Sequence, residues 1–121
     1  MRRTPARPVL VALLLAVSLP LSPAAAHHGW SSYDAGQLLE VTAALTDLDW
    51  ANPHATAKIV FRGARWDVIL APTARMENRG LSKDMIDRGQ SVTLIGYPRS
   101  DGTKEMRIER IVVGGKTVEL R

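Results

Sequence analysis

The three histidines are the residues of this chain best suited to bind a metal ion. His27 and His28 are adjacent and follow a run of three alanines, and His54 comes directly after Asn52-Pro53. Imidazole is the commonest metal ligand, and sites made only of nitrogen suit Cu(II) and Zn(II). If an exported precursor is cleaved after Ala26, the first residue is His27, which offers a metal both its α-amine and its ring Nδ1. The pattern predicts a metal site at His27, His28 and His54, with copper as the expected ion and zinc as the alternative.

This prediction tolerates a small error in the cleavage position. Cleavage after Ala24 instead leaves Ala25-Ala26-His27 at the new end and places His27 third, an arrangement that also binds Cu(II), through the amine and deprotonated amides. The competing interpretation is an exposed polar terminus without a ligand, and His54 then serves as a turn residue bonded to nearby backbone. Other side chains could contribute a carboxylate oxygen or a thioether sulfur to a metal site. Strand-end positions explain the aspartates better, and core positions explain the methionines better. These residues are Asp34, Asp47 and Asp49, and Met76, Met85 and Met106.

The sequence offers little support for thiol chemistry, enzymatic catalysis or a basic binding surface. The chain has no cysteine, which excludes thiolate sites and disulfides. It has no nucleophile motif, no glycine-rich phosphate loop and no carboxylate pair with distinct acid and base roles, so we do not expect an enzyme. Lys104, Arg107 and Arg110 alternate with Glu105 and Glu109. We interpret these residues as a solvated, charge-balanced face of a strand.

Residues 1–26 have the features of a secretory signal. Arginines 2, 3 and 7 precede an apolar run at residues 9–21, and Ala24 and Ala26 fit a signal peptidase site. The run is too short to span a bilayer, so we expect a periplasmic or secreted protein without a membrane anchor after cleavage. Three of the 16 Lys+Arg lie in this leader, which leaves 13 against 12 Asp+Glu. A nearly neutral mature chain has no electrostatic reason to bind nucleic acid.

The remaining chain is predicted to be mainly β. Alternating apolar residues predict strands at residues 38–50, 55–61, 65–70, 91–97 and 106–113, with a short edge piece at 118–120. The parity of the first run switches between Leu45 and Leu48, which indicates a β-bulge. Pro72 and Gly80 bracket a short helix at residues 73–79, and a second helical turn is expected at 82–88. Gly96 marks a bulge or a close backbone approach.

This order of elements predicts a small five-stranded barrel resembling the OB-fold, with one short helical connection between strands 3 and 4. The alternative is an open α+β sheet. We expect three segments: a signal peptide at residues 1–26, an N-terminal arm at 27–37 that Trp30 and Tyr33 hold down, and the barrel domain at 38–121. The expected function is periplasmic copper binding, with a metal ion as the first candidate partner and another periplasmic protein as the second. The alternative function is a module that binds a non-metal ligand or partner.

The sequence resembles a family of small exported bacterial proteins known as domain of unknown function 6152. The resemblance covers nearly all of the mature chain. It implies that His27, His28 and His54 belong to one functional patch, but it implies no activity. Tyr33 departs from the phenylalanine typical of relatives, a change that should preserve packing. The matching residues are His27-His28, Tyr33-Asp34, the run from Asp49 to His54, Trp66, Arg79-Gly80-Leu81, Gly89 and Gly96-Tyr97.

Overall fold

The alternating segment after Leu38 forms two consecutive strands. In a computed structural model that describes residues 29–121, β1 spans Leu39–Ala44 and β2 spans Thr46–Asp49. Leu45 separates them and is buried. Asp47 adopts a φ of 49°, and the register of β2 against β3 shifts between Thr46 and Asp49. The expected break in parity is therefore confirmed, and it divides the predicted first strand.

The next two strands form a hairpin. β3 (Thr56–Phe61) pairs antiparallel with β4 (Ala64–Ile69), and Gly63 occupies the turn at a φ of 72°, a conformation that favours glycine. Two further backbone hydrogen bonds continue this ladder from Ala55 to Leu70 and Ala71. The hairpin therefore fixes the chain immediately after His54.

A helical connection follows β4, where the sequence predicts one. Helix α1 spans Thr73–Asn78, one residue shorter than expected. The second predicted turn is a 3-10 helix, η3, at Lys83–Met85. Met76, Leu81 and Ile86 from this connection are fully buried, so it closes one end of the core.

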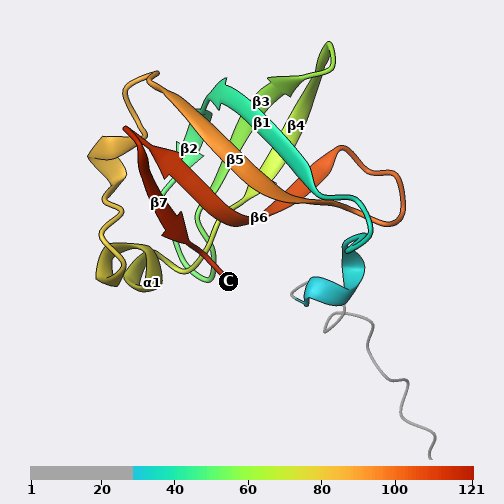
Figure 1. Cartoon of the computed structure of the whole chain (residues 1–121), viewed down its shortest axis with the longest axis horizontal. Coiled ribbons are helices and arrows are strands. Elements are labelled where there is room, and N and C mark those ends of the chain that lie inside the picture. Colours follow the sequence, from blue (N-terminus) through green and yellow to red (C-terminus); the bar gives the residue numbers. More distant parts are fainter. Residues whose placement is uncertain (1–28) are drawn as a thin grey trace, which may run out of the picture.

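The remaining strands are β5 (Ser91–Pro98), β6 (Glu105–Val113) and β7 (Lys116–Glu119). The strand order is β1-β5-β6-β4-β3-β2, with β7 on β6, and the β4–β6 pair is parallel. Since β1 and β2 are neighbours in sequence but stand at opposite ends of this order, the sheet curls into a half-barrel (Figure 1). Its inner face holds the core, which includes Ile59, Val68, Leu94, Ile108 and Ile111.

The mainly β class is confirmed, but the count of five strands is wrong. Residues 29–121 contain seven strands, because the first predicted strand breaks at Leu45 and the predicted edge piece is a paired strand, β7. Within the same residues, no helix is both long and apolar enough to cross a membrane.

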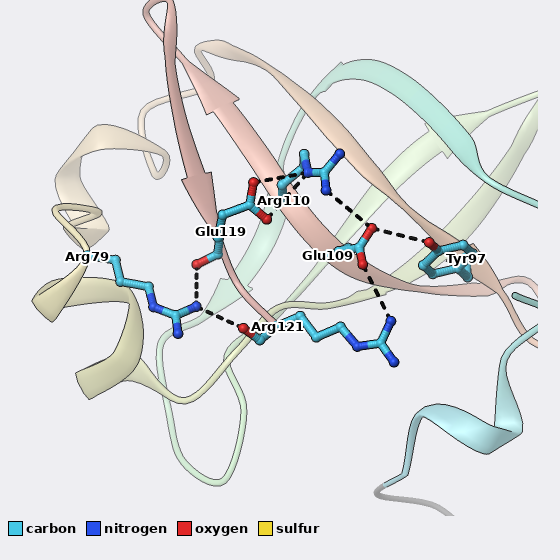
Figure 2. Close-up of polar contacts among 6 residues, drawn as sticks. All are labelled: Arg79, Tyr97, Glu109, Arg110, Glu119 and Arg121. Atoms are coloured by element: carbon cyan, nitrogen blue, oxygen red, sulfur yellow. Dashed lines mark hydrogen bonds and ion pairs between the residues drawn. The ribbon is translucent and has the colours of Figure 1, made fainter.

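Arginine side chains attach α1 to β7. Arg79, at the end of α1, donates from Nη1 to the main-chain oxygens of Glu119 (2.8 Å) and Arg121 (2.9 Å). On the same surface Glu109 accepts from Tyr97 Oη at 3.2 Å and from Arg121 Nη1 at 3.4 Å (Figure 2). These contacts hold the end of the chain beside β6, next to the arm.

The described part of the arm, residues 29–37, runs along one end of the sheet. It contains a 3-10 turn, η2 (Trp30–Ser32), and Tyr33 forms a β-bridge with Arg99. The amide of Asp34 donates to the oxygen of Pro98 at 2.9 Å. Tyr33 is 6% exposed, and the Trp30 ring packs edge-on against Tyr97. Trp30 and Tyr33 therefore hold this segment, as the sequence predicts.

Candidate functional site

A pocket of about 280 Å³ lies where the arm meets the end of the first hairpin. It brings together residues from the arm, from the turn before β3, from β3 and β4, and from the β5–β6 region. Its wall combines apolar groups with titratable ones, which is the usual composition of small-molecule sites. The lining residues are Tyr33, Pro53, His54, Thr56, Ile69, Arg99, Glu105 and Arg107.

His54 reaches this pocket because its neighbours on both sides are constrained. Asn52-Pro53 forms the turn before it, and Ala55 after it is fully buried and hydrogen-bonded to Leu70 and Ala71, which directly follow β4. The ring itself is half-buried. Its Nε2 lies 3.4 Å from Nη2 of Arg107. Since a guanidinium only donates, this contact is a hydrogen bond when Nε2 carries no proton.

Arg107 lies at the centre of the site and is only 7% exposed. The carbon of its guanidinium lies 4.5 Å from the centroid of the Trp30 ring, within the range of a cation–π interaction. The guanidinium of Arg121 lies 4.6 Å from the same ring. Burial lowers the pKa of Arg107, and the positive charges of Arg75 and Arg121 lower it further.

The interpretation of Arg107 as part of a solvated face is therefore wrong. Met106, Arg107 and Ile108 are three consecutive buried residues of β6. Strict alternation leaves the middle one facing solvent, but Trp30 and Tyr33 of the arm cover that face. Arg110 does behave as expected, because it is more exposed and pairs with Glu119 at 3.2 Å.

A second polar cluster forms the other side of the pocket. Tyr33 Oη donates to Glu105 Oε2 at 2.7 Å, and Arg99 Nη1 donates to the same oxygen at 3.4 Å. Arg99 also pairs with Asp101 at 3.3 Å. Burial raises the pKa of Tyr33, and the hydrogen bond to Glu105 raises it further. The phenol is therefore a neutral donor that links the arm to β6.

Of the three predicted ligands, only His54 belongs to the part of the chain that the structure describes. His27 and His28 lie outside residues 29–121. His54 lines the pocket, and Arg107 connects it to Trp30, which follows His28 by two residues. Among residues 29–121 no group of three or more histidine, aspartate and glutamate side chains is placed to hold a metal.

The weaker candidates serve local roles. Asp34 accepts from the amide of Gly36, and Asp47 forms an ion pair with Arg65 on the exposed hairpin. Asp49 is exposed at the end of β2. Met76 and Met106 are fully buried and Met85 is packed against the core, as core filling predicts. Trp50 also packs on the core and donates from Nε1 to Glu77 at 3.3 Å.

Sequence reasoning missed Arg99, Glu105 and Arg107 as pocket residues. Glu105 and Arg107 belong to a run of alternating charges typical of an exposed strand, and Arg99 begins the polar segment before it. No local pattern shows that the arm returns to cover them. One signal was available: Trp30 and Tyr33 are large aromatic residues in a polar segment, so they must bury their rings against something.

Comparison with known proteins gives a family but no activity. No curated protein matches the chain. A family model matches residues 14–107, which include all three histidines and end at Arg107. This match covers well over half of the sequence, and the chain therefore belongs to the Family of unknown function (DUF6152).

Proposed function

We propose that this chain is an exported periplasmic protein that binds copper, or alternatively zinc, through His27, His28 and His54. The observation that carries the proposal is the double contact of Arg107, which touches both the ring of His54 and the ring of Trp30. Two residues of chain span at most about 7 Å. Trp30, two residues after His28 in the chain, therefore lies beside the pocket of His54, and this supports a site shared by the three histidines.

The chemistry of the proposed site follows from the processed terminus. Cleavage after Ala26 exposes an amine on a residue that also bears an imidazole, and these two nitrogens form a chelate that His28 or His54 completes. Arg107 sets a condition on this site. Its guanidinium lies on the Nε2 side of His54 and disfavours a cation there, so binding through Nε2 requires Arg107 to move away from that nitrogen.

The proposed architecture is a barrel of the OB type built on residues 38–121, preceded by a leader at 1–26 and the arm at 27–37. The strand order supports it when β1 and β2 are counted as one bent strand, because the sheet then returns to the strand where it began. The parallel β4–β6 pair and the helical connection before β5 fit the same arrangement. β7 is an addition at the edge.

The proposed role is that of a carrier, buffer or accessory factor rather than an enzyme. Its partners are the metal ion and a second periplasmic protein that delivers or receives it. The nearly balanced charge of the mature chain supports neither nucleic-acid binding nor attachment to an anionic membrane surface.

The test compares two proteins that differ only at the first residue. One begins at His27, and the other carries an additional methionine before it; mass spectrometry verifies both termini. We expect Cu(II) to bind the first at least about tenfold more tightly and to give a nitrogen-rich electron paramagnetic resonance spectrum. Equal affinity in the two proteins contradicts the terminal site. Zn(II) competition identifies the preferred ion.

A second pair of variants tests the contribution of the pocket. His54→Gln keeps a polar side chain in the turn but removes the imidazole, and we expect weaker Cu(II) binding with fewer coordinated nitrogens. Asp49→Asn is the matched control, because Asp49 is an exposed residue close in sequence. If both variants bind copper like the parent protein, His54 is not a ligand.

A further inference from the structure

The pocket beside His54 has an excess of positive charge at its wall. Two arginines line it, Arg99 and Arg107, against one carboxylate, Glu105. Glu105 accepts hydrogen bonds from Tyr33 and Arg99, so its charge is already compensated. The wall of the pocket therefore keeps a net positive charge, to which the guanidinium of Arg107 contributes.

The surroundings of Arg107 increase this effect. Its side chain is more than nine-tenths buried and touches an imidazole and an indole ring. Arg75 and Arg121 are close enough to act on it electrostatically, and both are positive. A buried cation among other cations attracts an anion, because the opposite charge offsets both the hydration that the cation loses on burial and its repulsion from the other cations.

The shape of the pocket selects among anions. Pro53, Thr56 and Ile69 provide carbon surface opposite the charged groups, and the volume of about 280 Å³ is at the lower end for ligand sites. A guanidinium presents paired donors that match the two oxygens of a carboxylate. A ligand with a carboxylate at one end and a short carbon chain at the other satisfies both walls.

We propose that this pocket binds a small organic carboxylate, with Arg107 as its principal anchor. The inference goes beyond the metal site proposed above and is independent of it, because it concerns the protein without metal. His54 takes part as a neighbour of the anchor and need not bind a metal for the ligand to enter.

The experiment titrates metal-free protein with acetate, propionate and succinate, and in parallel with the corresponding neutral amides. Metal is removed over a chelating resin, since soluble chelators are themselves carboxylates, and ionic strength is held constant with sodium chloride. Binding is followed by nuclear magnetic resonance, with the indole signal of Trp30 and the amides of residues 53–56 and 105–107 as reporters. We expect at least one carboxylate to bind about tenfold more tightly than its amide.

Two substitutions locate the site, and a third is the control. Arg107→Met should reduce carboxylate affinity at least about tenfold, and Arg107→Lys should recover only part of it because the paired donors are lost. Thr56→Phe fills the pocket without changing any charge and should also abolish binding. Arg65→Met removes an exposed arginine of β4 and should have no effect.

The possible results of these titrations either support or contradict the carboxylate site. Carboxylate binding that is lost in Arg107→Met and Thr56→Phe but kept in Arg65→Met supports the proposal. Amides that bind as well as carboxylates overturn it, as does an equal loss in the Arg65 control. The absence of shifts at the reporter residues up to tens of millimolar carboxylate in the folded parent protein also overturns it. None of these results depends on whether the protein binds copper.

Discussion

Tyr33 joins the arm to β6 through one buried hydroxyl. That hydroxyl donates to Glu105, which Arg99 also contacts, so the arm is attached by a hydrogen bond to a charged acceptor. Such bonds are stronger than neutral ones. Burial and Glu105 both raise the pKa of Tyr33, because the ionised phenol would have little water and a carboxylate beside it. The folded protein therefore requires the neutral form.

This requirement makes stability depend on pH in the alkaline range. An unfolded tyrosine ionises near about pH 10, whereas Tyr33 in the folded protein stays protonated to a higher pH. Its contribution is complete below about pH 10 and is lost as the pH rises toward the folded pKa. We expect Tyr33→Phe to lower the free energy of unfolding by about 1–2 kcal/mol at neutral pH and to remove this alkaline loss.

Urea unfolding of both proteins at neutral pH and just above about pH 10 measures the two effects. At neutral pH the difference between them reports the bond to Glu105. If parent and variant lose stability in parallel above that pH, the ionisation of Tyr33 is not responsible.

Some individual residues of the candidate site could be predicted from the sequence. His54 could be identified because histidine after an Asn-Pro turn is an unusual residue in an informative place. Trp30 and Tyr33 could be identified as anchors because aromatic rings need burial. Arg107 could not, because its burial depends on residues more than 70 positions away in the chain, and its neighbours in sequence are those of an exposed strand.

At the scale of elements, Gly96 determines how closely β5 approaches β6 next to the site. The register of this strand pair shifts between Ile95 and Gly96. A Cβ at Gly96 would lie 2.1 Å from the main-chain oxygen of Arg107, which is closer than any real contact. The absence of a side chain is therefore what lets the β6 backbone at Arg107 sit against β5.

We expect Gly96→Ala to destabilise the protein by about 1–3 kcal/mol, because the strands must separate or bend to admit the methyl group. The displacement should also reach the Arg107 backbone, so the amide signals of residues 106–108 should shift in nuclear magnetic resonance spectra. Thermal unfolding gives the stability change.

Gly29→Ala is the matched control. Its added Cβ meets Ser31 Oγ at 3.4 Å and the Ser31 main-chain nitrogen at 3.9 Å, both ordinary contacts, so we expect a change within about 0.5 kcal/mol. A Gly96→Ala protein as stable as the parent, with unshifted signals at residues 106–108, would show that β6 does not depend on this close approach.

Most elements were predictable because their signals are local. Alternation gave the hairpin of β3 and β4, and Pro72 with Gly80 gave α1. The parity change at Leu45 predicted the bend. It did not predict that the segment forms two strands, because whether a bulged segment is one strand or two depends on which strands pair with each half. β2 pairs with β3 across the turn at Asn52-Pro53, which is a local signal, whereas β1 pairs with β5 from a distant part of the chain, and this pairing has none.

At the scale of the whole molecule, the run from Leu39 to Asp49 joins both ends of the sheet. β1 stands at one end of the strand order and β2 at the other, so this run holds the curl that places the arm, β6 and the first hairpin around one pocket. Leu45, between the two strands, is 5% exposed and belongs to the core cluster. Its side chain therefore packs at the point where the two ends meet.

This position makes Leu45 a test of whether the sheet behaves as one unit. We expect Leu45→Ala to cost about 2–5 kcal/mol and to speed amide hydrogen exchange in β1 and β2 together, because the lost packing supports both ends. Leu38→Ala is the control, since Leu38 is 57% exposed and its truncation should stay within about 0.5 kcal/mol. Faster exchange in only one of the two strands would mean that the halves of the sheet open independently, and the pocket would then depend on one half alone.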